Sequence, residues 1–81
     1  MARRKIDLHG YSIGDAEAAV DRFLYEAQQS GFDQVEIVTG KGTGAIYSAV
    51  CKYLKAGGYP YKTAKGRGGK PNPGALTVIL T

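Results

Sequence analysis

The sequence predicts a single α/β domain of residues 1–81, a two-layer sandwich with a mixed four-stranded sheet and a core from about residue 5 onward. The chain has 81 residues, which suits one domain. Four segments have strand-like apolar patterns, and two segments repeat apolar residues at helical spacing. Their order is β-α-β-α-β-β. Each β-α-β unit implies parallel strands and a right-handed crossover, while the last two strands can pair as a hairpin.

The first half of the chain contains two predicted strands separated by a helix. Residues 5–9 alternate apolar and polar, which indicates a strand with one buried face. Ser12 suits a helix N-cap and Gly31 suits the position after a C-cap, with apolar residues at helical spacing between them. Residues 35–38 are mostly apolar and β-branched, so they predict a short buried strand.

The second half continues with a helix, two strands and a basic loop. Apolar residues recur at helical spacing over 46–54, and a pair of glycines ends this helix. Residues 59–64 alternate again, but Pro60 cannot donate to a ladder, so we expect an edge strand or one whose pairing starts late. Residues 65–74 have no apolar anchor apart from prolines and predict a mobile basic loop. Residues 75–80 are apolar on both faces and predict a central strand.

Charge is distributed unevenly along the chain. Four basic and seven acidic residues give the first 36 residues a net charge of −3, whereas seven basic residues and no acid give the remainder +7. Seven unpaired cations repel one another unless an anionic partner neutralises them, which points to nucleic acid. A basic surface kept for solubility is the alternative. No membrane partner is expected, because the basic residues lie among glycines and turns rather than along an amphipathic helix.

Cysteine content and hydropathy favour a cytoplasmic protein. Cys51 is the only cysteine, so the chain cannot form an internal disulfide. No stretch approaches the ~18 consecutive apolar residues that a membrane span needs. The basic N-terminus is not followed by an apolar run of signal-peptide length.

Asp7 and His9 are candidate catalytic residues at the end of the first predicted strand. Residues two apart on a strand share a face, so a carboxylate and the only imidazole of the chain are expected close together. Histidine exchanges protons near neutral pH, and a neighbouring carboxylate can orient it for phosphodiester hydrolysis. Equally well, both side chains could simply hydrogen-bond backbone at the strand end.

A glycine-rich loop follows the second predicted strand and leads into the second helix. Its residues are Gly40, Lys41, Gly42, Thr43 and Gly44. Glycines let the backbone approach a phosphate, and the helix N-terminus offers N–H groups and partial positive charge. The spacing is neither a P-loop nor a dinucleotide fingerprint. If the strands are parallel, this loop meets Asp7 and His9 at one sheet edge, although a tight turn alone would also need the glycines.

The third candidate region is the basic loop before the last strand. Lys65, Arg67 and Lys70 are separated by glycines, so they can follow a phosphate backbone. Tyr59 and Tyr61 could stack on unpaired bases, but packing at the core edge is favoured. No metal-ligand cluster is visible in the sequence. Asp7 alone makes a poor metal site, and the sequence leaves assistance by magnesium or manganese open.

Three segments together resemble the Smr (small MutS-related) domain family. Ile6-Asp7-Leu8-His9-Gly10 resembles the family's LDLHG start, and Thr39–Gly44 resembles its HGxGTG loop. The final segment, Gly74–Leu80, looks like the family's closing G-x-x-x-V-x-L strand. The resemblance spans roughly residues 5–81.

This resemblance implies a fold like the C-terminal domain of translation initiation factor three and a nicking or RNA-cleaving nuclease activity. It also implies that the chain can belong to a larger MutS-related protein. Asp7 and His9 fall on the family's proposed catalytic pair, and Gly40, Lys41, Gly42 and Gly44 on its substrate loop. Thr39 departs from the family's histidine, which implies slower cleavage or binding without cleavage.

Three functions therefore follow from the sequence. The first is a nuclease that acts on DNA or RNA with Asp7 and His9 as its acid–base pair. The second is a non-catalytic nucleic-acid or ribosome-binding module, favoured by the basic second half and by Thr39. The third is a protein-interaction domain whose basic loop meets an acidic partner.

Overall fold

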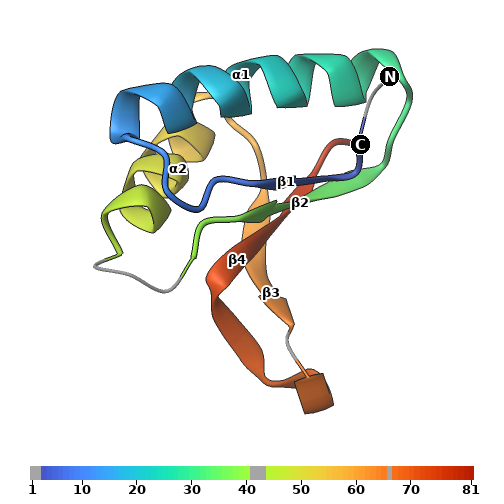
Figure 1. The fold of residues 1–81 in the computed structure, drawn as a ribbon. Helices are drawn as coiled ribbons and strands as arrows, with labels where there is room; N and C mark the ends of the chain where they lie inside the picture. The colour runs from blue at the N-terminus through green and yellow to red at the C-terminus, as the bar shows by residue number, and fades with distance from the viewer. Residues whose placement is uncertain (1–2, 41–43, 66) are drawn as a thin grey trace.

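A computed structural model describes residues 3–40, 44–65 and 67–81 (Figure 1). The predicted order of two helices and four strands is confirmed. In chain order the elements are β1 (Lys5–Asp7), α1 (Ile13–Gln29), β2 (Gln34–Val38), α2 (Ala45–Ala56), β3 (Tyr61–Lys65), a 3-10 turn (Arg67–Gly69) and β4 (Pro71–Ile79).

The four strands form one mixed sheet in the order β1-β2-β4-β3. β1 is parallel to β2, and β4 is antiparallel to both β2 and β3. The last strand is therefore central and β3 lies at an edge, as predicted. Figure 1 shows the helical layer on one side of the sheet. Alternate residues of β2 are buried, which is the pattern of a sheet covered on one face, so the domain is a two-layer sandwich.

Local backbone chemistry sets the ends of α1. The Ser12 hydroxyl accepts a hydrogen bond from the backbone N–H of Asp15 at 3.2 Å, so Ser12 is the N-cap. After the helix, Gly31 adopts φ +78°, and the Phe32 N–H bonds to the Ala27 carbonyl. This is a Schellman ending, in which glycine supplies the left-handed residue. Both helix signals read from the sequence are thus confirmed.

The core lies between the helices and the covered face of the sheet. Its largest fully buried side chains come from both helices, from strands β2 and β4 and from the residue that follows β1. They are Leu8, Val20, Leu24, Ile37, Val50, Leu54, Leu76 and Val78. Tyr59 and Tyr61 pack against this cluster, and the Tyr59 hydroxyl accepts a hydrogen bond from Gln28 at 3.0 Å. The core assignment of these two tyrosines is confirmed.

The basic loop has narrower bounds than the 65–74 that the sequence predicts. β3 runs on to Lys65, and β4 begins at Pro71, which pairs with Lys65. Proline is tolerated here because Pro71 is the first residue of its strand. The register shifts between Thr63 and Lys65, so several β4 residues oppose Ala64 as a bulge. The predicted loop is therefore wrong in its bounds, because Lys65 belongs to β3 and the residues from Pro71 onward belong to β4.

None of the helices in the part of the chain that the structure describes is long and apolar enough to cross a membrane.

Candidate functional site

Two of the sequence motifs meet at the carboxyl ends of β1 and β2. Asp7 pairs with Val38 across the parallel ladder, and the Leu8 N–H bonds to the Val38 carbonyl at 2.7 Å. The chain then presents His9 beside Gly40. A Cβ placed on Gly40 would lie 3.5 Å from Cδ2 of His9, so the imidazole lies next to Gly40. The expected convergence of His9 and Gly40 at one sheet edge is present.

Asp7 shapes the turn that carries His9. Its Oδ1 accepts a hydrogen bond from the backbone N–H of His9 at 2.9 Å. The Tyr11 N–H bonds to the Leu8 carbonyl at 3.0 Å, and Gly10 between them adopts φ +83°. Asp7 therefore hydrogen-bonds backbone at the end of the strand, which is one of the two roles considered for it from the sequence. Both Asp7 and His9 are exposed, so the turn presents the imidazole to solvent.

Thr39 is part of the structural support beneath the site. It is only 6% exposed and continues the buried alternation of β2 toward the helical layer. Its Oγ1 donates to the Gly74 carbonyl at 3.1 Å, and the N–H groups of Thr39 and Gly40 bond to the same oxygen at 2.7 and 3.1 Å. The residue that replaces the family's histidine thus ties β2 to β4 just before Gly40.

The glycine segment continues into the N-terminus of α2. Gly44 is the N-cap residue with φ +84°, and its carbonyl accepts the Ser48 N–H at 2.9 Å. The first turn of α2 contains no acidic residue, so no carboxylate offsets the partial positive charge of this helix end. The predicted binding residues Lys41, Gly42 and Thr43 lie outside the described residues.

The remaining predicted binding residues belong to the β3–β4 hairpin. Figure 1 shows this hairpin extending beyond the rest of the sheet, away from the helices. Lys70 is exposed at its far end. Lys65 ends β3 and Arg67 begins the 3-10 turn, and only their backbone is described. Because Gly74 at the base of β4 bonds to Thr39 and Gly40, the hairpin and the glycine segment share one anchor.

Sequence reasoning missed Gly74 as a residue of this site. Its carbonyl fixes the position of Gly40, but a backbone acceptor in a bulged strand has no side-chain signature. The one available signal was a glycine between a proline and an apolar run, where a bulge is common. Within the described residues, no group of three His, Cys, Asp or Glu residues is placed to hold a metal ion.

The sequence matches one protein family over nearly its whole length, the family described as the Smr domain, over residues 6–81. Endonuclease MutS2 of Staphylococcus saprophyticus is 38% identical over 78 residues, and endonuclease MutS2 of Acetivibrio thermocellus is 36% identical over 76 residues. These matches cover 96% and 94% of this chain but only 10% of each relative. The chain therefore corresponds to a small part of those proteins.

Solved structures with the same fold carry related descriptions. The Smr domain of Thermus thermophilus MutS2 superposes with a TM-score of 0.83 at 29% identity, covering 98% of this chain and 99% of that one. YdaL, a stand-alone small MutS-related protein from Escherichia coli, gives a TM-score of 0.83 at 25% identity, covering 95% of this chain and 63% of that one.

Proposed function

Because this chain belongs to the Smr domain family, we propose that it binds nucleic acid and hydrolyses phosphodiester bonds where His9 meets Gly40. The observation that carries the proposal is the position of the His9 imidazole next to Gly40. It puts the one histidine of the chain beside a segment that leads to the N-terminus of α2, whose first turn holds no acidic residue. An acid–base group and an anion-binding element are thus neighbours.

The proposed chemistry follows from these two elements. A phosphate group lies against the glycine segment, where the N-terminus of α2 attracts its negative charge. His9 accepts a proton from the attacking hydroxyl or water and later returns one to the leaving oxygen. Asp7 accepts the backbone N–H of His9 and so positions the imidazole. Its second carboxylate oxygen takes part directly in the proton transfer.

Four basic residues of the second half supply the affinity. Lys70 at the far end of the hairpin, together with Lys65, Arg67 and Lys41, would contact phosphates on either side of the bond that is cut. Such contacts release counterions, so binding should weaken steeply with salt. The name of the relatives, endonuclease MutS2, agrees with this activity. That name, however, describes proteins about ten times longer than the matched part.

The test compares the purified domain with His9→Ala on supercoiled plasmid and on structured RNA. Reactions contain magnesium, manganese or a chelator. Loss of general acid–base catalysis should slow cleavage by about 10²–10⁴-fold while binding is retained. Gln29→Ala, an exposed residue in the last turn of α1, is the matched control. Undiminished cleavage by His9→Ala would contradict the assigned role.

A second candidate is a nucleic-acid or ribosome-binding module without catalysis. The buried Thr39 favours it, because this residue provides a structural hydrogen bond where the family pattern has an imidazole. This function predicts retardation of nucleic acid on a gel, with log K falling by about 0.7–0.9 per phosphate contact for each decade of salt. It also predicts no cleavage under any metal condition.

A further inference from the structure

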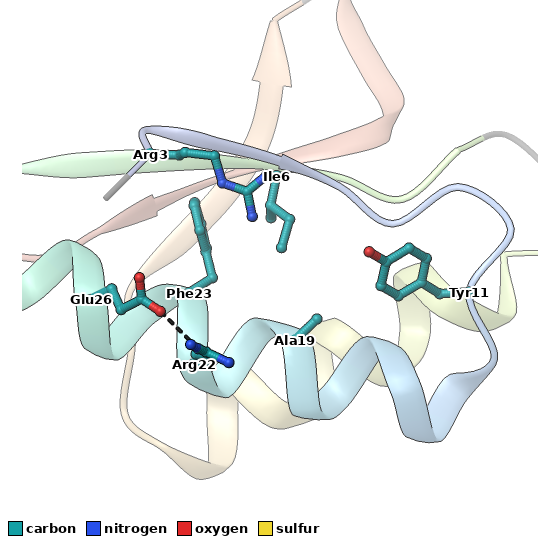
Figure 2. A pocket seen from close by; sticks show the side chains of 7 residues that line it. All are labelled: Arg3, Ile6, Tyr11, Ala19, Arg22, Phe23 and Glu26. Carbon is teal, nitrogen blue, oxygen red and sulfur yellow. Dashed lines mark hydrogen bonds and ion pairs between the residues drawn. The ribbon is translucent and has the colours of Figure 1, made fainter. Parts of the chain in front are cut away.

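A groove of about 310 Å³ runs between β1 and α1, next to the turn that carries His9 (Figure 2). Ile6 from the strand and Ala19 and Phe23 from the helix form its apolar floor, and Arg3, Tyr11, Arg22 and Glu26 make the rest of the lining polar. Figure 2 shows Tyr11 at one end and Arg3 at the other. This volume of about 310 Å³ is at the lower end of the range for small-ligand sites, so the groove suits one small group.

The two ends of the groove carry polar groups without partners. Tyr11 is 43% exposed, and Figure 2 shows its hydroxyl directed over the apolar floor. Within the described parts of the chain, neither the Tyr11 hydroxyl nor the Arg3 guanidinium makes a hydrogen bond or ion pair. An aromatic face and a phenolic hydroxyl therefore stand opposite an uncompensated cation.

The other cations nearby have partners, which makes Arg3 distinct. Arg22 and Glu26 both line the groove, and they form an ion pair with each other at 2.9 Å. Lys5 is paired with Glu36 at 3.5 Å, and the guanidinium of Arg4 lies 5.1 Å from the centre of the Phe32 ring. The positive charge available to an incoming anion at this groove therefore comes from Arg3.

We propose that this groove holds one unpaired nucleotide of a nucleic-acid strand that passes His9. The base lies on the apolar floor against the Tyr11 ring, and the adjoining phosphate lies at Arg3. Aromatic stacking with neighbouring cations is how single-stranded nucleic acid is generally held. The inference rests on the proposed nucleic-acid function and specifies a substrate with an unpaired region.

Chain continuity links the groove to the proposed cleavage site. Tyr11 is two residues after His9, and its N–H closes the turn on Leu8. Two residues span at most about 7 Å of chain, so a strand in contact with His9 reaches Tyr11 without a long gap.

A peptide strand added to the edge of the sheet is the competing occupant, and the edge disfavours it. β1 has three residues, and the two that point away from the core, Lys5 and Asp7, are charged and exposed. Short edge strands with lysine are a common protection against strand addition. A nucleotide needs only the floor and the two polar ends.

The first experiment is an NMR titration of the isotope-labelled domain with a short single-stranded RNA and with the same sequence as a duplex. The amides of Tyr11, Ala19 and Phe23 should shift with the single strand and not with the blunt duplex. The amides of His9 and Gly40 should shift with both. Adenosine monophosphate, an unmodified acidic peptide and a phenylalanine-containing acidic peptide serve as separate probes.

Variants then assign the two ends. Tyr11→Ala should weaken single-strand binding by roughly 5- to 150-fold, and Tyr11→Phe, which keeps the ring, should lose much less. Arg3→Gln should reduce the slope of log K against log salt by about 0.7, the value for one phosphate contact on a single strand. Lys55→Gln, in the last turn of α2, is the matched charge control for Arg3→Gln.

The outcomes separate the groove from the proposed function. Shifts at His9 and Gly40 with none in the groove would overturn the groove assignment and leave the nucleic-acid function standing. No shift with any nucleic acid would overturn both. Groove shifts with a peptide but not with RNA would identify a protein-binding groove instead, and equal binding of the mononucleotide would show that the strand is not the ligand.

Discussion

Gly40→Ala tests whether the glycine segment and His9 form one site. Gly40 adopts φ +87°, a backbone conformation that alanine rarely adopts. The added methyl group would lie 3.5 Å from Cδ2 of His9, which is ordinary van der Waals contact. The substitution therefore strains the backbone without a steric clash, and it puts a new group against the imidazole.

The expected loss of stability follows from two opposing effects. A left-handed conformation costs a residue with a Cβ about 1–2 kcal/mol. Alanine also restricts the unfolded chain, which returns about 0.4–1 kcal/mol. The free energy of unfolding should therefore fall by about 1 kcal/mol, which lowers the thermal midpoint by roughly 4–8 °C for a domain of this size.

Gly31→Ala is the matched control for backbone strain. Gly31 also has a positive φ, +78°, and a Cβ there would have no heavy atom within 4 Å. Urea denaturation followed by circular dichroism should give similar losses for the two variants. Only Gly40→Ala should move the ring proton resonances of His9 and alter nucleic-acid cleavage or binding. A Gly40→Ala domain with wild-type stability, or with unchanged His9 resonances, would refute this geometry.

Three further substitutions test separate parts of the fold. Ser12→Ala should cost about 1 kcal/mol and speed hydrogen exchange in the first turn of α1; unchanged exchange would argue against the cap. Thr39→Val should cost about 0.5 kcal/mol in urea denaturation, at the low end for a hydrogen bond, because two N–H groups remain on the Gly74 carbonyl. Partial burial and the hydrogen bond to Asp21 raise the pKa of Tyr53 from 10.0 to about 12. The protonated Tyr53 hydroxyl therefore stabilises the fold fully below pH 10, and this stabilisation is lost as pH rises through 12. Tyr53→Phe should flatten the resulting alkaline decline in the urea midpoint.

Most of the fold could be predicted from local patterns. Ser12 and Gly31 marked the ends of α1, and Pro60 placed the neighbouring strand at an edge. The bounds of the basic loop could not be predicted, because Pro71 and the residues after it normally interrupt a ladder. Here Pro71 begins the strand, and a bulge accommodates the rest, which depends on a partner strand rather than on local sequence.

The candidate site was partly visible for the same reason. Parallel strands bring their carboxyl ends to one edge, so His9 and Gly40 were expected together and lie next to each other. The hydrogen bond between Thr39 and Gly74 joins residues 35 positions apart, and no periodicity or motif in the sequence predicts it. The groove at Tyr11 and Arg3 was also invisible, because it depends on how closely α1 approaches β1.

The register of the sheet has a consequence for how this domain can be joined to other polypeptide. The Arg4 carbonyl accepts the Glu36 N–H, and the Leu80 N–H bonds to the Asp33 carbonyl. Both ends of the described chain therefore flank the start of β2, whereas His9 lies beyond the opposite end of that strand. Additional sequence at either terminus would therefore leave the domain near the start of β2. A fluorescent label, an affinity tag or a neighbouring domain attached after Leu80 therefore leaves far from His9, whereas one attached before Arg3 would begin beside the groove.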